Sequence, residues 1–153
     1  MIETASIFDM EAWARGIMAF RQPDFVIGEG YLNRWFIVPR NELGNVYLHE
    51  FCRSDDDRAF HDHPWDSTSL ILSGRYIEHT PEGSFMRQAG ETHSRVATAM
   101  HRIELLPGER AITLFFTGPK LREWGFDCPQ GWRHWRDFCA GENGEVVGRG
   151  CEP

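Results

Sequence analysis

The chain has 153 residues, which is enough for one ordinary domain, and no internal repeat, low-complexity tract or linker divides it. Hydrophobic residues make up 41% and charged residues 25%, as in most globular proteins, and the formal net charge is −7. Because nucleic-acid binders need a basic face and anionic membranes attract basic segments, this charge argues against both kinds of partner.

The N-terminal region is predicted to form a helix over residues 9–20, with Asp9 as its N-cap. Its apolar positions recur at spacings of three and four: Met10, Trp13, Ile17 and Phe20. We expect Trp13 and Ile17 to pack this helix against the outside of the domain. The segment before it carries no basic cluster, unlike a signal peptide, and no apolar run approaches the roughly 20 residues of a membrane helix. The expected location is therefore cytoplasmic.

After Pro23 the pattern changes to short apolar or alternating runs that Gly, Pro, Asn and Asp interrupt. The runs predict strands at residues 25–27, 31–38, 46–51, 69–72, 76–80, 84–87, 95–97, 101–106, 111–117 and 123–126. Short strands at this spacing after a single helix are typical of an antiparallel sandwich or barrel. We therefore expect an all-β domain whose barrel spans about residues 25–138, and a loosely held tail at 140–153 that is rich in Gly and Glu.

The four cysteines, Cys52, Cys128, Cys139 and Cys151, have no CxxC spacing. We interpret them as free thiols in a reducing compartment, in preference to a disulfide framework or a zinc knuckle. Cys52 and Cys128 are expected to be small buried hydrophobes.

The segment that begins at His61 carries the clearest chemical signal. His61 and His63 stand two residues apart, and because side chains alternate along a strand, both should point to the same face. Two imidazoles on one face can bind one metal ion. A third histidine has to come from another strand, and His101, which follows a turn at residues 89–91, is the candidate.

This pattern resembles the two motifs of the cupin superfamily. His61, His63 and Gly74 match the first motif in spacing, and the Ala-Gly-Glu turn at 89–91 with His101 matches a loose form of the second. The sequence is also similar to a group of small, uncharacterised bacterial cupin-like proteins. The resemblance implies a double-stranded β-helix, or jelly-roll barrel, with one divalent metal ion (Fe, Zn, Ni or Mn) on these three histidines.

The chain departs from the cupin pattern at the glutamate ligand, which should fall at Ser67 or Thr68. A hydroxyl is a poor metal ligand, so the site either has three histidines or recruits a carboxylate. Asp66 has the wrong strand parity unless a bulge turns it inward, and Glu78 shares a face with Tyr76. We expect Ser67 to lie beside the coordination position that this glutamate would otherwise fill. Three neutral imidazoles leave the charge of the metal uncompensated, which favours an anionic ligand.

Candidate substrate-binding residues are Arg53, Tyr76, Glu78 and Trp65, and Tyr76 is also the candidate catalytic residue. Tyr76 and Trp65 can equally be ordinary core residues. His49 could be a fourth ligand, but we favour a hydrogen-bonded strand histidine.

Three functions remain open for such a chain. The first is a mononuclear iron oxygenase acting on a small, anionic organic molecule, since thiol dioxygenases resemble this three-His pattern. The second is an isomerase or lyase with a redox-inert metal, and the third is a small-molecule-binding or sensing protein without turnover. No P-loop, GxGxxG, GxSxG or HExxH motif is present. The expected partners are a small molecule and a second copy of the chain, in a homodimer.

Overall fold

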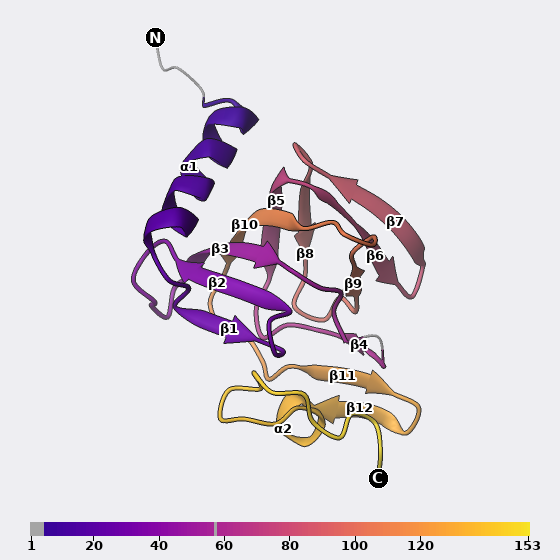
Figure 1. The fold of residues 1–153 in the computed structure, drawn as a ribbon. Helices are drawn as coiled ribbons and strands as arrows, with labels where there is room; N and C mark the ends of the chain where they lie inside the picture. The colour runs from indigo at the N-terminus through magenta and orange to yellow at the C-terminus, as the bar shows by residue number, and fades with distance from the viewer. Residues whose placement is uncertain (1–4, 57) are drawn as a thin grey trace.

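The computed structural model describes residues 5–56 and 58–153. The chain is mostly antiparallel β-structure with one N-terminal helix (Figure 1). The elements are α1 (Ile7–Phe20), β1 (Phe25–Ile27), β2 (Leu32–Phe36), β3 (Asn45–Phe51), β4 (Phe60–His61), β5 (Ser67–Ser73), β6 (Arg75–Thr80), β7 (Gly83–Gln88), β8 (Thr92–Arg95), β9 (Arg102–Glu104), β10 (Ala111–Thr117), β11 (Gly125–Cys128), β12 (Gly131–His134) and α2 (Trp135–Phe138). This confirms the predicted all-β class with a short N-terminal helix. None of the helices in the described part of the chain has the length and apolarity to cross a membrane.

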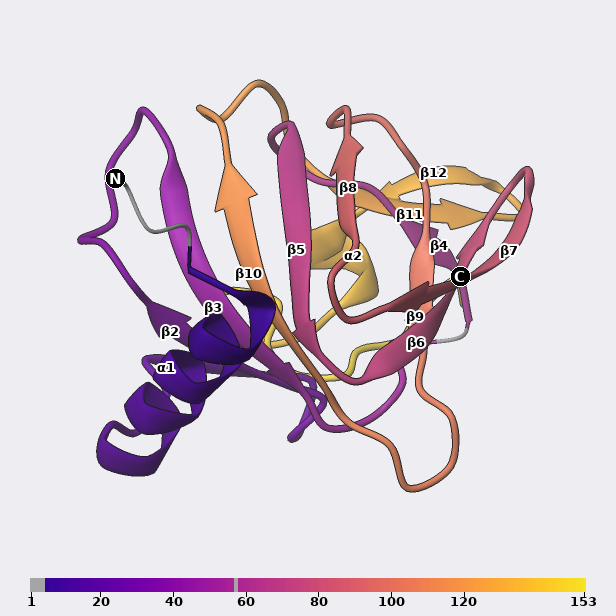
Figure 2. The same ribbon diagram turned by 90° about the horizontal axis from the view of Figure 1, so that it is seen from above.

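The strands form three antiparallel sheets. The largest has the order β1-β2-β3-β10-β5-β8, and the smaller ones have the orders β12-β11-β4 and β7-β6-β9. Figure 2 shows β3, β10, β5 and β8 side by side, with α1 against the outer face of this sheet and α2 beyond its other face. The interior of the barrel therefore lies between the large sheet and the two small ones.

The strands of the large sheet contribute to two hydrophobic cores on opposite faces. Leu48 and Leu114 belong to the outer core, which packs against α1. Phe51 and Ile71 belong to the inner core, inside the barrel. Fully burying one such side chain stabilises the fold by about 1.5–3 kcal/mol. Because a slip of one residue would exchange the two faces, these cores fix the register of the strands.

Helix α1 begins two residues earlier than predicted, at Ile7. Ser6 is the N-cap, and a capping box joins it to Asp9: the Asp9 N–H donates to Ser6 Oγ at 3.2 Å, and the Ser6 N–H donates to Asp9 Oδ2 at 3.0 Å. Asp9 is thus the third residue of the helix and not its cap. Ile17 packs on the outer core as expected, but Trp13 is 44% exposed and contributes little to that packing.

The C-terminal region is more ordered than its composition predicts. Cys128 on β11 and Cys151 form a disulfide, which corrects the interpretation of all four cysteines as free thiols. Cys52 and Cys139 are free. The tail is also tied by backbone hydrogen bonds, from the Gly150 N–H to the Phe138 carbonyl at 3.0 Å and in both directions between Ala140 and Val146. The loose tail expected at residues 140–153 is therefore not found.

Gly74 makes the tight connection between β5 and β6. Its φ of +77° lies in the left-handed region, and a Cβ atom there would stand 2.0 Å from the Arg110 carbonyl oxygen. A larger residue would push β5 away from the end of β10, which explains in physical terms why the motif has glycine at this position.

Candidate metal centre

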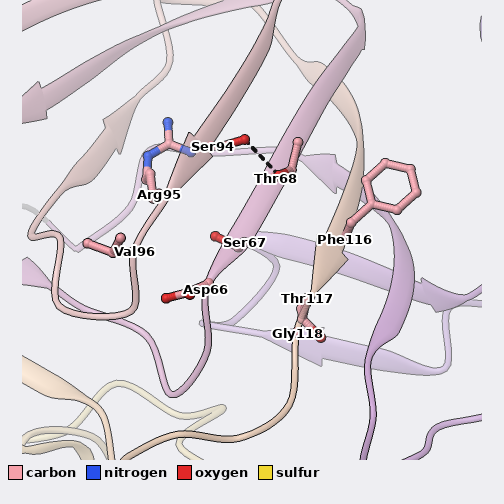
Figure 3. A pocket seen from close by; sticks show the side chains of 9 residues that line it. All are labelled: Asp66, Ser67, Thr68, Ser94, Arg95, Val96, Phe116, Thr117 and Gly118. Atoms are coloured by element: carbon pink, nitrogen blue, oxygen red, sulfur yellow. Dashed lines mark hydrogen bonds between the residues drawn. The ribbon is translucent and has the colours of Figure 1, made fainter.

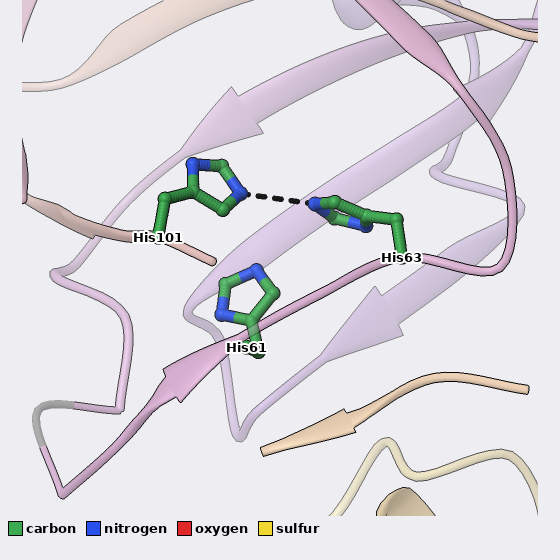
Figure 4. Close-up of side chains that lie close together, drawn as sticks. All are labelled: His61, His63 and His101. Carbon is green, nitrogen blue, oxygen red and sulfur yellow. Dashed lines mark hydrogen bonds between the residues drawn. The ribbon is translucent and has the colours of Figure 1, made fainter. Parts of the chain in front are cut away.

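Backbone hydrogen bonds bring two of the predicted metal ligands together. His61 and His101 are directly opposite each other, with the His61 N–H donating to the His101 carbonyl at 2.9 Å and the His101 N–H donating back at 3.0 Å. Strand β4 ends at His61, and beyond it the Asp62 N–H donates to the Gly125 carbonyl at 3.0 Å and the His63 N–H to the Ala97 carbonyl at 3.0 Å. The rings of His61 and His63 are therefore on the same side of the chain, as the parity predicted (Figure 4).

The three imidazole rings converge. The Nε2 atoms of His63 and His101 are 2.9 Å apart, and one ring nitrogen from each histidine lies within 4.8 Å of the others. The ring centroid of His61 is 5.1 Å from that of His63 and 4.8 Å from that of His101. The structure thus brings together all three histidines that the sequence singled out.

The residue between the two neighbouring histidines points the other way. Asp62 is 1% exposed, and its carboxylate accepts hydrogen bonds from the Gly125 N–H at 2.7 Å and from Trp132 Nε1 at 3.0 Å. It also pairs with Arg122. Asp62 therefore anchors the histidine strand to β11 and β12. We missed this role in the sequence, although the alternation of the His-Asp-His triplet indicated that Asp62 faces away from the cluster.

A carboxylate behind His101 fixes the tautomer of this ring. Glu78 Oε1 lies 2.8 Å from His101 Nδ1, while Glu78 also binds Arg87 Nε at 2.9 Å and pairs with Arg95. Burial alone would raise the pKa of Glu78, but the hydrogen bond from His101 and the charge of Arg95 outweigh it and lower the pKa to about 2. The ionised carboxylate keeps a proton on Nδ1, so the Nε2 atom of His101 presents a lone pair to the cluster.

His61 has a similar partner on its outer side. Asp55 Oδ2 lies 3.1 Å from His61 Nδ1. Burial disfavours the charged form of both residues, but their mutual attraction and hydrogen bond are stronger. The pKa of Asp55 is therefore lowered and that of His61 is raised. The Nε2 atom of His61 is left facing the cluster.

The other two rings of the cluster are neutral. Burial, together with the charges of neighbouring groups, lowers the pKa of His63 well below its usual value, and burial lowers that of His101 to about 4. His63 is stacked on Trp65, with ring centroids 5.0 Å apart and an interplanar angle of 13°.

This donor set fits a divalent metal ion. Neutral imidazole nitrogens are ligands for zinc, iron and nickel, and outer carboxylates commonly orient such rings. Because His101 Nε2 carries a lone pair, the His63 nitrogen 2.9 Å away either donates a proton to it or shares a cation with it. A metal ion in the cluster would satisfy all three converging nitrogens at once.

The cluster opens onto a cavity of about 990 Å³ inside the barrel. Of the predicted substrate-binding residues, Tyr76, Trp65 and Arg53 line it. Burial raises the pKa of Tyr76 to about 12, so its hydroxyl keeps its proton at neutral pH. Arg53 is exposed, and its Nη2 atom donates to the Gly28 carbonyl at 2.6 Å. Glu78 is not among the lining residues, because its carboxylate is held behind His101 and not in contact with the cavity.

Among the described residues, no carboxylate joins the three converging ring nitrogens. Ser67 and Asp66 line a separate hollow of about 500 Å³ on the side of the barrel (Figure 3), where Asp66 Oδ1 accepts a hydrogen bond from the Ala97 N–H at 2.7 Å. Ser69, one step further along the same face of β5, lines the main cavity instead. Ser67, although buried, is not among the residues that line the main cavity, and its place beside the metal position stays a prediction.

The comparisons with known proteins identify the fold. No family model and no curated protein matches the chain. Among solved structures, the DMSP lyase DddQ from Ruegeria pomeroyi has a TM-score of 0.61 at 13% identity, over 79% of this chain and 67% of that one. The polyketide cyclase RemF from Streptomyces resistomycificus has a TM-score of 0.55 at 12% identity, over 77% and 80%. An uncharacterised protein with a double-stranded β-helix domain from Klebsiella pneumoniae has a TM-score of 0.55 at 15% identity, over 82% and 97%. Identities this low establish a shared fold and nothing further.

Proposed function

We propose that this chain, which has the cupin fold predicted from its motifs, binds one divalent metal ion on His61, His63 and His101 and acts as an enzyme on a small, anionic organic molecule. The observation that carries the proposal is the convergence of three ring nitrogens at the wall of a cavity of about 990 Å³. Cavities of this size, with a few converging polar groups, are typical of small-molecule sites.

The charges around the cluster support an anionic substrate. The three imidazoles contribute no negative charge, and the charge of Glu78 is offset by Arg87 and Arg95. Asp62 is paired with Arg122, and Asp55 lies behind His61. The charge of a bound divalent ion would therefore be only partly compensated, which favours a carboxylate, thiolate or enolate as an additional ligand.

Our first reaction class is oxygenation. The three-His ligand set, without a carboxylate, resembles that of thiol dioxygenases, as the sequence indicated. An iron(II) ion there would supply redox chemistry with dioxygen, and a zinc or manganese ion would act as a Lewis acid. The protein residues would position the substrate in the cavity and shield it from bulk water, because aromatic rings such as Trp65 and Trp124 wall the space beside the cluster.

A second candidate is a redox-neutral lyase, isomerase or cyclase. Tyr76 favours it, because the residue lines the cavity and its hydroxyl, which stays protonated at neutral pH, is available as a donor to an oxyanion that develops on the substrate. Two of the similar structures are described as a lyase and a polyketide cyclase.

Metal analysis of untagged protein purified without oxygen tests these candidates. Stoichiometric iron(II) that binds nitric oxide, a probe for open coordination positions, would support the oxygenase. Stoichiometric zinc, nickel or manganese would support the Lewis-acid enzyme. Protein that binds none of these ions, even after loading, would contradict both and leave a small-molecule-binding protein without turnover.

A further inference from the structure

A positively charged side chain projects into the cavity away from the histidine cluster. Arg34 lies at the middle of β2, half-buried, and lines the cavity. Its Nε atom donates to His49 Nε2 at 2.9 Å, and its guanidinium carbon lies 4.5 Å from the centre of the Tyr47 ring. Neighbouring strands therefore fix the guanidinium group: the Cα atoms of Arg34 and His49 are partners in the pairing of β2 with β3.

This guanidinium group has no negative partner among residues 5–56 and 58–153. None of the ion pairs in that part of the chain involves Arg34. By contrast, Arg87 and Arg95, for example, both pair with Glu78. Arg40, a second positively charged residue that lines the same cavity, is close enough to affect the pKa of Arg34. Burial, the main cause, lowers the pKa of Arg34 to about 10, which leaves it charged at neutral pH. A half-buried cation without an ion-pair partner is available to bind an anion from outside the chain.

Aromatic rings join this charge to the histidine cluster. His49 is stacked on Phe115, with ring centroids 5.1 Å apart, and Phe115 in turn lies 6.0 Å from His63 and 5.4 Å from Trp65. The cavity wall between the cluster and Arg34 is therefore a continuous series of aromatic rings.

We propose that Arg34 binds the oxyanion of an organic substrate, a carboxylate or a phosphate, whose apolar body lies along Phe115 toward the metal position. This inference rests on the proposed function and adds the substrate class to it. Since Nε is engaged by His49, the two Nη atoms remain to bind the oxyanion end-on through two hydrogen bonds. His49 is a positioning residue, because burial, followed by the charge of Arg34, lowers its pKa well below the usual value and keeps Nε2 as an acceptor.

Calorimetric binding of three probes tests the inference. The probes are 3-phenylpropanoate, 3-phenylpropyl phosphate and the neutral 3-phenylpropanamide, each added to zinc-treated protein of measured zinc content. We expect at least one anion to bind about tenfold or more tightly than the amide, since one charge-assisted bidentate contact supplies this much. The anion that binds more tightly shows whether the site prefers carboxylates or phosphates.

Variants then assign the preference to Arg34. Arg34→Met should lose the preference for the anion, Arg34→Lys should keep part of it as a point charge, and Arg15→Met, on the outer helix, should behave as wild type. His49→Gln should keep the preference because its amide oxygen can accept from Arg34, whereas His49→Leu should weaken it. Equal affinity of wild type for the amide and both anions, or an unchanged preference in Arg34→Met, would overturn the inference.

Zinc content separates this inference from the proposed function. Arg34 does not touch the histidine cluster, so Arg34→Met should hold as much zinc as wild type. Protein without zinc that still shows Arg34-dependent anion binding would reject the metal site and support the anion site. Protein that holds stoichiometric zinc but binds the anion equally well with and without Arg34 would support the metal site and reject the anion site.

Discussion

Glu78 Oε1 lies 2.8 Å from His101 Nδ1, on the side of the ring that faces away from the other two histidines. The carboxylate is 1% exposed and is held there by Arg87 and Arg95. It orients a ligand of the proposed metal without being a ligand itself, and such outer partners set both the tautomer and the basicity of the ring.

Changing this carboxylate should weaken metal binding. Glu78→Gln should lower the affinity for zinc by about tenfold to a hundredfold, because His101 loses the charge that orients it. The free energy of unfolding should also fall by about 3 kcal/mol, since Arg87 and Arg95 would lose a buried partner. Competition with a zinc chelator and urea unfolding measure the two effects. The control, Glu91→Gln, removes a half-buried partner of His93 at the surface and should change neither quantity by much.

Removing one proposed ligand should abolish stoichiometric metal binding. His61→Ala should hold little metal after loading and gel filtration, because two imidazoles make a weak site. Elemental analysis of the protein provides the measurement. His93→Ala is the matched control: His93 lies on β8, outside the cluster, with Nε2 2.9 Å from Glu91 Oε2, and this variant should bind metal as wild type does. Wild-type metal content in His61→Ala would refute the proposed site.

The disulfide should contribute to stability. Cys151→Ser removes a bridge between residues 23 positions apart, and the entropy of closing such a loop corresponds to about 3 kcal/mol. Denaturant unfolding with and without reductant measures it. Reductant should destabilise the wild type by a similar amount and leave Cys151→Ser unchanged. Cys52→Ser, at a free cysteine, should still respond to reductant as wild type does.

The chain remains predicted to form a homodimer. Large apolar side chains of α1 face solvent, with Phe20 92% and Phe8 78% exposed, and association would cover such surface. Light scattering should give twice the 17.7 kDa mass of the chain. A monomer mass at high protein concentration would contradict the prediction.

The sequence predicted what depends on local periodicity. Residues 25–27 and 111–117 were assigned as strands with the bounds that β1 and β10 have, and the parity of His61 and His63 placed their rings on one side. What was missed depends on how distant segments meet. The pairing of Arg34 with His49 needs the register of β2 on β3, and the disulfide needs the tail to return past α2 to β11. No short-range pattern carries such information.

Side chains alternate along β3, so residues that stabilise the fold and residues that line the cavity lie on opposite faces of this strand. Leu48 packs toward α1, whereas Tyr47 and His49 face the cavity, so one strand carries stability on one face and chemistry on the other. Substitutions on the cavity face can change ligand preference while the helix-facing residues still hold the strands in register. Over evolutionary time, relatives of this chain can therefore diverge in substrate without losing the scaffold, and their sequence variation should be concentrated at every second position of the strand.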